Sequence, residues 1–175
     1  MALHQRVHRI SHPAITGTAR LTYYIFEGIL VGNLGSADRQ VKPGPSGPEG
    51  RFVYLTAWSG GAGGSRKLPP QDSANNPYEY GLKEKGAIRG GPIPPGTYRI
   101  FPPSVHPTFK LSARLEPLQK VPNNRGGFFI HGRGPKGSDG CIVLNDSDHH
   151  PIMNALARSR GGLLVVCEAV DGAFA

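Results

Sequence analysis

Glycine and proline are the residues that most constrain how this chain can fold. They occupy 25 and 17 of the 175 positions, without a repeating period that would indicate a fibre. Both residues disrupt the interiors of helices and strands, so regular elements have to be short and joined by long loops. Hydrophobic residues still make up 38% of the chain, which is enough for a core. We therefore predict a mainly β protein whose short strands carry the core and whose loops hold the glycines and prolines.

The length of the chain fits one domain, since 175 residues are too few for two comfortable ones. We treat residues 1–175 as a single domain in which residues 1–19 form a flexible N-terminal arm. No stretch approaches the roughly 18 apolar residues that span a membrane, and the polar N-terminus does not resemble a secretory signal peptide. We expect a protein that is made in the cytoplasm and that, if secreted, leaves without a cleaved signal.

The charge of the chain indicates an anionic partner or surface, because the net charge is +8 and the pI is near 9.8. Nucleic acid, phospholipid and bacterial wall polymers all qualify. The basic residues are scattered, and Arg6, Arg9 and Arg20 lack the interleaved aromatic residues of a platform for single-stranded nucleic acid. We therefore do not expect nucleic acid to be the partner.

Strands are predicted where β-branched, aromatic and aliphatic residues gather between turn signals. One helix is predicted from residue 147 or 148 to about residue 159, followed by Gly161 as a stop. Residues 59–95 form the longest irregular stretch, which is either a surface excursion or a lid that lines the substrate. Residues 102–125 are predicted to be a connecting segment only. The predicted strands cover residues 21–26, 29–34, 52–58, 97–101, 127–131, 141–144 and 163–170, with a turn at Glu27-Gly28.

Cysteine and histidine at the two ends of one loop point to nucleophilic catalysis. His131 ends one predicted strand, Cys141 begins the next, and the nine residues between them include four glycines. A thiol is a weak nucleophile at neutral pH unless a neighbouring imidazole takes its proton. We expect the two strand ends to lie side by side and to bring the imidazole within hydrogen-bond reach of the sulfur.

The turn Ser138-Asp139-Gly140-Cys141 is the candidate oxyanion site. Successive backbone N–H groups in a glycine-containing turn can bind a developing negative charge, and we assign this role to Gly140 and Cys141. Gly140 also permits positive φ just before the nucleophile. Ser138 is predicted to hydrogen-bond the loop or the imidazole and is placed with the catalytic residues. Cys167 lies in an apolar run and is predicted to be a buried strand residue, without a disulfide to Cys141.

Two separated motifs resemble one known family. The pattern His131-Gly132 followed by Ser138-Asp139-Gly140-Cys141-Ile142 resembles the active-site signature of L,D-transpeptidases of the YkuD type. It is more similar to the L,D-transpeptidase-like effectors of type VI secretion, in which an upstream Gly-x-Ile-Pro-x-Gly-x-Tyr segment also recurs. Residues 91–98 (GPIPPGTY) match that segment. The resemblance covers roughly residues 52–145.

The resemblance implies a fold, a triad and a reaction. The fold would be a small mixed β sandwich or barrel-like sheet with one or two short helices, and the triad a Cys, a His and a backbone carbonyl. Cys141 would attack the acyl carbonyl of the L-centre residue in a peptidoglycan stem tetrapeptide and expel the terminal D-alanine. Water would then give an L,D-carboxypeptidase, and an amine would give exchange or cross-linking. Action in the periplasm of a target bacterium would add a secretion-machine carrier and a cognate immunity protein as partners.

The sequence departs from housekeeping members of that family at two positions. Asp139 stands where they carry a histidine, and Val143 stands where an arginine helps to bind the substrate carboxylate. We expect Arg125 or Arg133 to take over that carboxylate, and we add Gly132 and Asp139 to the substrate-binding residues. Asp139 would disfavour a neighbouring thiolate, so we expect its carboxylate to point outward.

Two other functions are compatible with the sequence. A zinc hydrolase would use His131, Cys141 and one of His149 and His150 as three ligands, but the run from Asp146 to His150 is better explained as the start of a helix. We therefore predict no metal and no cofactor. A cationic module that binds the cell wall or nucleic acid without turnover is the other possibility, and it predicts that Cys141→Ala leaves the activity intact.

Overall fold

The computed structural model describes residues 15–35 and 52–171. Most of the predicted N-terminal arm lies outside these residues, and its described end leads directly into the first strand, where the Thr18 N–H donates to the carbonyl of Ser159. No helix among the described residues is long and apolar enough to cross a membrane. In chain order the elements are β1 (Ala19–Tyr24), β2 (Ile29–Asn33), β3 (Phe52–Ser59), β4 (Gly96–Ile100), β5 (Ser104–His106), β6 (Lys110–Pro117), a 3-10 turn (Pro122–Asn124), β7 (Phe128–Gly132), β8 (Ile142–Leu144), α1 (Asp146–Arg158) and β9 (Gly162–Cys167).

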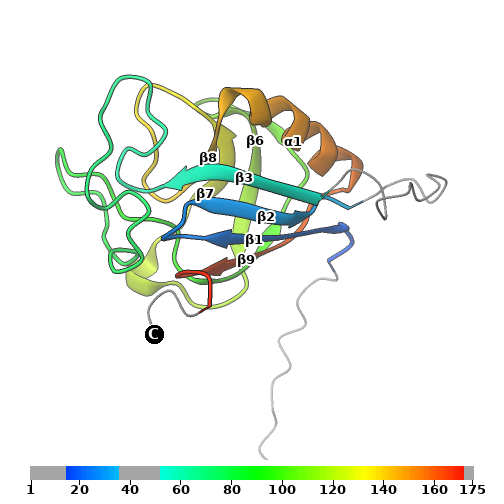
Figure 1. Ribbon diagram of the computed structural model, residues 1–175, viewed down its shortest axis with the longest axis horizontal. Helices are drawn as coiled ribbons and strands as arrows, with labels where there is room; N and C mark the ends of the chain where they lie inside the picture. Colours follow the sequence, from blue (N-terminus) through cyan, green and yellow to red (C-terminus); the bar gives the residue numbers. More distant parts are fainter. Residues whose placement is uncertain (1–14, 36–51, 172–175) are drawn as a thin grey trace, which may run out of the picture.

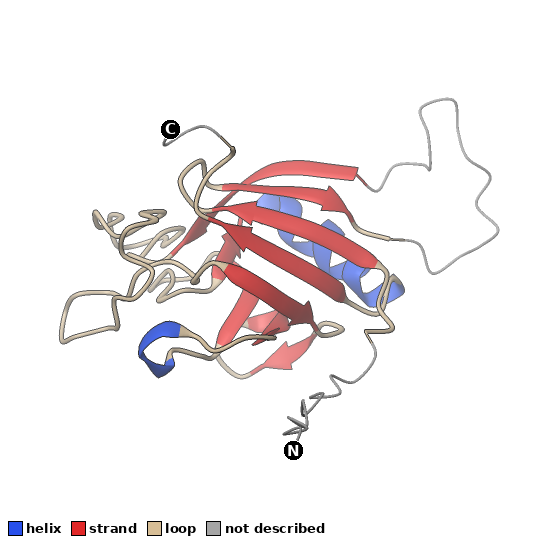
Figure 2. Cartoon of the chain, turned by 90° about the horizontal axis from the view of Figure 1, so that it is seen from below, coloured by secondary structure: helices blue, strands red, loops and turns tan. Residues whose placement is uncertain are grey.

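Eight of the strands close into a barrel. Their order is β4-β9-β1-β2-β3-β8-β7-β6, and a further pairing between β4 and β6 joins the two ends of the sheet. The ninth strand, β5, pairs only with β6. The sheet is mixed, because β1–β9 and β7–β8 are parallel whereas the other pairs are antiparallel. The predicted mainly β, barrel-like fold is therefore confirmed, and Figures 1 and 2 show the strands around a common interior.

Alternation along the strands fills the barrel. In β1 the side chains of Ala19, Leu21 and Tyr23 are buried and alternate with more exposed ones, as expected for a strand with one face on the core. The helix α1 lies along the outside of the barrel (Figure 2) and contacts β6 and β7. Its buried face consists of Ile152, Met153, Ala155 and Leu156.

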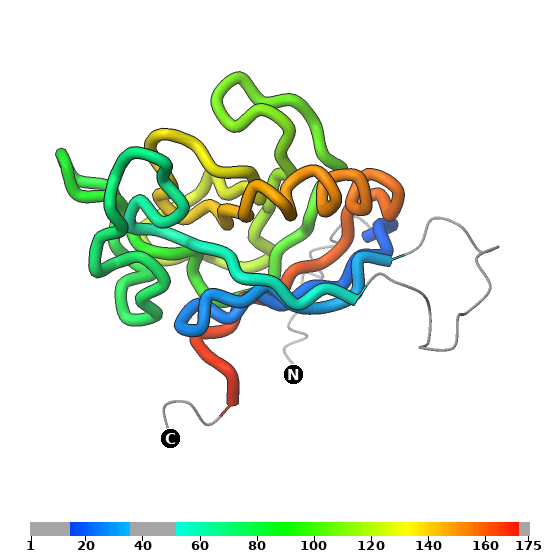
Figure 3. Tube along the Cα trace, turned by 45° about the horizontal axis from the view of Figure 1, so that its top comes forward, coloured from blue at the N-terminus to red at the C-terminus, as the bar shows by residue number. Residues whose placement is uncertain are grey.

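The prediction of a mere connecting segment over residues 102–125 was wrong, because β5 and β6 form a hairpin there. The prolines fall in the turns and at the strand end, where no ladder hydrogen bond is lost. Besides β5, the strand β6 pairs with β4, which precedes it, and with β7, which follows it, and the local sequence pattern does not show these pairings between separate elements. The hairpin projects beside α1 in Figure 3.

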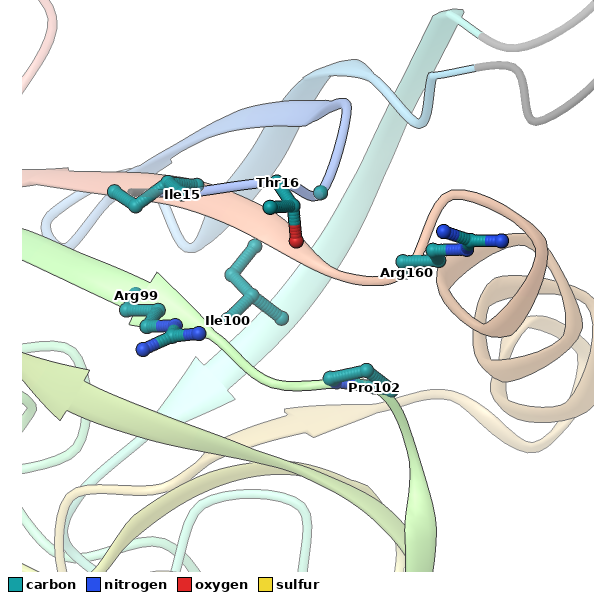
Figure 4. A pocket seen from close by; sticks show the side chains of 7 residues that line it. Ile15, Thr16, Arg99, Ile100, Pro102 and Arg160 are labelled. Atoms are coloured by element: carbon teal, nitrogen blue, oxygen red, sulfur yellow. The ribbon is translucent and has the colours of Figure 1, made fainter. Parts of the chain in front are cut away.

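Among the cavities in the described part of the chain, two differ clearly in size and lining. The smaller one, about 190 Å³, has two arginines among its lining residues, and Figure 4 shows Arg99 on β4 and Arg160 beside the end of α1. The larger one, about 750 Å³, contains both His131 and Cys141 in its wall.

Candidate active site

The larger cavity lies where the loop after β7 meets the tip of the β5–β6 hairpin. His131 comes from β7, Cys141 immediately precedes β8, and the loop between them supplies most of one wall. Residues 66, 84 and 89 complete the rim of the cavity, and they belong to the irregular stretch of residues 59–95, which we call the long loop. The lining residues are Arg66, Glu84, Arg89, Thr108, Phe109, Lys110, Gly126, Gly127, His131, Gly132, Arg133, Gly134, Pro135, Lys136, Gly137, Ser138, Asp139 and Cys141.

The parallel pairing of β7 with β8 places the two candidate catalytic side chains on one face. His131 pairs with Val143, and Ile130 pairs with Ile142, so Cys141 comes alongside Phe129. Side chains two apart on a strand share a face. The imidazole and the thiol are therefore diagonal neighbours across the two paired strands.

A backbone carbonyl orients the imidazole of His131. The Nδ1 atom lies 2.6 Å from the carbonyl oxygen of Gly132. Since a carbonyl only accepts, Nδ1 carries the proton in the neutral ring and Nε2 holds a free lone pair. Nε2 is buried and has no hydrogen-bond partner. Of the roles that an imidazole can take, this arrangement favours a general base acting through Nε2.

Burial keeps His131 neutral. It lowers the pKa of the imidazole below its ordinary value, and the nearby His149 and His106 act in the same direction. The hydrogen bond to the Gly132 carbonyl raises the pKa but does not overcome burial. The ring is therefore mostly unprotonated at pH 7 and able to accept a proton.

The thiol of Cys141 is also neutral at rest. Only 6% of the residue is exposed, and burial raises its pKa to about 12, with the backbone of Phe129 opposing this effect and Asp139 adding to it. The Sγ atom donates to the Gly127 carbonyl at 3.7 Å. The expected thiol–imidazole hydrogen bond is not formed, because the thiol has this other acceptor and Nε2 of His131 has no partner.

Ser138 holds the turn that leads to the nucleophile. Its hydroxyl donates to the carbonyl of Cys141 at 2.5 Å and accepts from the N–H groups of Gly140 (3.0 Å) and Gly60 (3.2 Å). All three contacts are to backbone, so Ser138 fixes the loop rather than the imidazole. The predicted oxyanion donor at Gly140 needs correction, since its N–H is already bonded to Ser138. The N–H of Cys141 stays a predicted donor.

Gly140 is required by its conformation and its surroundings. Its φ is +128°, and a Cβ there would lie 2.7 Å from both the guanidinium of Arg125 and the ring of Phe128. The positive φ expected just before Cys141 is confirmed.

Arg125 links the long loop to the catalytic turn, which is the turn Ser138-Asp139-Gly140-Cys141. Its buried guanidinium donates to the carbonyls of Pro92 (2.6 Å), Gly91 (2.8 Å) and Asp139 (2.6 Å), and also to that of Tyr80. With these acceptors in place it does not line the cavity. The predicted role of Arg125 as a ligand of the substrate carboxylate is therefore not supported.

Arg133 does line the cavity. Its Nε donates to the Gly64 carbonyl at 3.1 Å and one terminal nitrogen donates to the Ser65 carbonyl at 3.2 Å, while the group lies 5.5 Å from the ring centre of Trp58. These contacts leave its other terminal nitrogen without a protein acceptor among the described residues. Of Arg125 and Arg133, only Arg133 thus stays a predicted ligand of the substrate carboxylate.

The carboxylate of Asp139 is turned toward the long loop. It accepts from the Gly90 N–H at 3.0 Å and pairs with Arg89 at 3.4 Å. Gly132 is constrained differently, because a Cβ there would lie 2.7 Å from the ring of His149. Both residues line the cavity.

Sequence reasoning missed the contribution of the β5–β6 hairpin. Thr108, Phe109 and Lys110 at its tip line the cavity, as do Arg66 and Arg89 from the long loop. No motif marks these positions, and they reach the site only through tertiary pairing of β6. The lining role of the long loop agrees with the lid alternative stated for residues 59–95.

The described part of the chain offers no ligand set for the zinc hydrolase, because no group of three or more His, Cys, Asp and Glu side chains there could hold a metal ion. His149 instead donates from Nε2 to the Leu111 carbonyl at 2.7 Å. Cys141 and Cys167 are both free, and Cys167 lies in β9 as predicted but is half-buried there rather than buried.

Comparison with known proteins finds a similar solved structure. No family model and no curated protein matches the sequence. The chain is similar to the crystal structure of the L,D-transpeptidase (residues 123–326) from Xylanimonas cellulosilytica, with 15% sequence identity and a TM-score of 0.46. The alignment covers 89% of this chain and 63% of that one.

Proposed function

We propose that this protein is a cysteine-dependent acyl-transfer enzyme that acts on peptidoglycan stem tetrapeptides as an L,D-carboxypeptidase or L,D-transpeptidase. One observation carries the proposal. His131 on β7 and Cys141 just before β8 lie on one face of the paired strands in the wall of one cavity, and the Gly132 carbonyl leaves Nε2 of the imidazole free to accept a proton. The motifs shared with L,D-transpeptidases supply the substrate class.

The protonation states favour proton transfer during attack over a preformed ion pair. Because the thiol pKa is raised and the imidazole pKa is lowered, the resting pair is neutral. Nε2 of His131 takes the thiol proton as sulfur attacks the acyl carbonyl, and the same proton goes to the amine of the departing D-alanine. Water or an acceptor amine then attacks the thioester and gives a proton to Nε2. Nε2 passes this proton to the departing sulfur, which restores the thiol.

The charge around the cavity favours a substrate with a carboxylate. Five lining residues are cationic and two are acidic. The acids are Glu84 and Asp139, and both are paired with Arg89. Arg66 pairs with Asp146, so Lys110, Arg133 and Lys136 carry the remaining positive charge, which raises the local concentration of an anionic stem peptide. The cationic residues are Arg66, Arg89, Lys110, Arg133 and Lys136.

Incubation with muropeptides tests the proposal. Purified protein should remove or exchange the terminal D-alanine of tetrapeptide stems, as followed by mass spectrometry. Cys141→Ala should be inactive, and His131→Ala should lose about 10²- to 10⁴-fold in rate, which is the usual contribution of a general base. Cys167→Ala is the matched control, because that thiol lies at the end of β9 and should be dispensable. Full turnover by Cys141→Ala would refute cysteine catalysis.

We also propose that the enzyme is an antibacterial effector that acts in the periplasm of a target bacterium, with a secretion-machine carrier and a cognate immunity protein as partners. The support is the resemblance to type VI secretion effectors. Expression in a Gram-negative host with an added periplasmic leader should arrest growth, whereas cytoplasmic expression and leader-bearing Cys141→Ala should not. Equal growth of all three strains would contradict the proposal.

A wall-binding module without turnover is the second candidate. The buried, protonated thiol and the cationic rim favour it. It predicts that wild type and Cys141→Ala bind purified sacculi equally, that binding falls as salt rises, and that no D-alanine is released. Release of D-alanine by the wild type decides against it.

A further inference from the structure

The tip of the β5–β6 hairpin packs directly against the candidate base. The ring of Phe109 is centred 4.5 Å from that of His131, with an angle of 9° between the ring planes. The two rings are therefore stacked face to face. Phe109 also contacts Phe129, which precedes His131 by two residues on the same face of β7, at 5.1 Å.

His106 fixes the hairpin tip that carries Phe109. Its Nδ1 accepts from the N–H groups of Thr108 (3.1 Å) and Phe109 (3.2 Å), and its ring stacks on Phe109 at 4.7 Å. The next residue, Lys110, takes a φ of +58°, which closes the turn back into β6. The position of Phe109 is thus set by hydrogen bonds and stacking within the hairpin, independently of any substrate.

The imidazole of His131 is held by two contacts of different kinds. The Gly132 carbonyl binds one edge through Nδ1, and Phe109 covers one face. An in-plane hydrogen bond alone leaves the ring free to tilt about that bond, whereas a stacked neighbour removes this freedom. Together they fix the direction of the Nε2 lone pair.

We propose that Phe109 is a positioning residue, which holds the His131 imidazole at the angle at which Nε2 can reach the thiol proton and the leaving amine. The proposal rests on the function proposed above. Phe109 acts through His131, and the hairpin tip is therefore part of the catalytic apparatus rather than a surface excursion. A base held within a small angular range makes productive contacts more often, so the effect falls on turnover rather than on substrate binding.

The same contact contributes to the charge state of the base. Burial is the main cause of the lowered pKa of His131, and Phe109 covers one ring face. Other charged or titratable groups at the site are His106 on β5, His149 on α1, Cys141 before β8, and the cavity-lining Asp139, Arg133 and Lys110. Removing the phenyl ring exposes the imidazole to water without changing any of these charges.

Two variants and a control separate positioning from folding. Phe109→Leu keeps an apolar side chain but loses the stack, and Phe109→Tyr keeps the ring. Phe52→Ala removes a phenyl ring that is 69% exposed on β3. For Phe109→Leu we expect kcat on muropeptides to fall on the order of tenfold, with KM changed less than about threefold. Phe109→Tyr and Phe52→Ala should retain near wild-type kcat.

A titration that does not depend on activity completes the test. NMR of ¹⁵N-labelled imidazoles should show the pKa of His131 moving up toward 6.5 in Phe109→Leu and staying low in Phe109→Tyr. An unchanged His131 titration together with unchanged kcat in Phe109→Leu overturns the inference. Loss of kcat that Phe109→Tyr does not restore also overturns it. If the wild type turns over no muropeptide although the titration shifts, the proposed function fails, and the positioning role of Phe109 in turnover fails with it.

Discussion

His131 and Cys141 are each held in the neutral form by their surroundings. Burial disfavours the charged form of both groups, which lowers the pKa of the imidazole and raises that of the thiol. An ion-pair mechanism would need the opposite shifts. Sequence could locate the two residues and their order along the chain, but it could not show the Gly127 carbonyl that accepts from the thiol, because that contact depends on how the strands pair.

The pH dependence of activity follows from the lowered pKa of His131. Protonation of Nε2 removes the base, so kcat/KM should fall with decreasing pH only once the pH approaches the lowered pKa, which lies below the ordinary 6.5. Activity at pH 6.5 should therefore exceed half of its plateau. Rates on muropeptides between pH 4.5 and 8 measure this, since the profile of kcat/KM reports the free enzyme. An acid limb centred above pH 6.5 would exclude His131, in this environment, as the base.

At the scale of elements, the catalytic turn is built by contacts from distant loops. Arg125 joins the carbonyls of the long loop to that of Asp139, and Ser138 connects the turn to Gly60. The sequence could indicate β7, β8 and the glycine-rich loop, because each has a strong local pattern. It could not indicate that β7 and β8 are parallel, nor that β6 lies between β4 and β7, since both depend on closure of the barrel.

Replacement of Arg125 tests how much its hydrogen bonds to the backbone carbonyls contribute to stability. Lysine keeps the charge but lacks the planar fork, so Arg125→Lys leaves several of the four carbonyls without their donor. We expect a loss of about 2–3 kcal/mol in the free energy of unfolding, typical for hydrogen bonds to a charged group. Arg114→Lys is the matched control, because that guanidinium is half exposed, pairs with Glu116 and lies 4.0 Å from the ring centre of Phe101, contacts that a lysine can also make, and its change should stay within about 1 kcal/mol.

Urea unfolding of the two arginine variants measures the difference. Activity gives a second readout, since Arg125→Lys should also lower turnover by shifting the turn before Cys141, whereas Arg114→Lys should not. Equal stability of both variants would show that the carbonyls are satisfied without Arg125.

At the scale of the whole molecule, buried groups that ionise only at high pH make the stability fall as the pH rises. Tyr23 and Tyr98 are fully buried, and burial raises the pKa of each phenol well above its usual value. Tyr23 donates to Asn75 of the long loop at 2.6 Å, and Tyr98 donates to the Pro94 carbonyl at 2.7 Å. These phenols and the Cys141 thiol therefore stay protonated in the folded protein at pH values where the unfolded chain ionises.

The sign of the resulting pH dependence is fixed by linkage. Above the unfolded pKa of each group the unfolded chain binds fewer protons than the folded protein, so stability falls as pH rises. For Cys141 the loss begins near pH 9 and continues to about 12, with a slope of up to about 1.4 kcal/mol per pH unit. The two phenols add to it above about pH 10.

Chemical unfolding between pH 7 and 10.5 should therefore show a declining free energy of unfolding that steepens above pH 9. Cys141→Ala should flatten the decline between pH 9 and 10, because it removes the one buried thiol that ionises on unfolding in this range. Cys167→Ala should change the slope less, since that thiol is half-buried and its pKa is raised less strongly. Parallel pH profiles for wild type and Cys141→Ala would mean that the thiol is already open to solvent in the folded protein, and the low-dielectric site described for it would not exist.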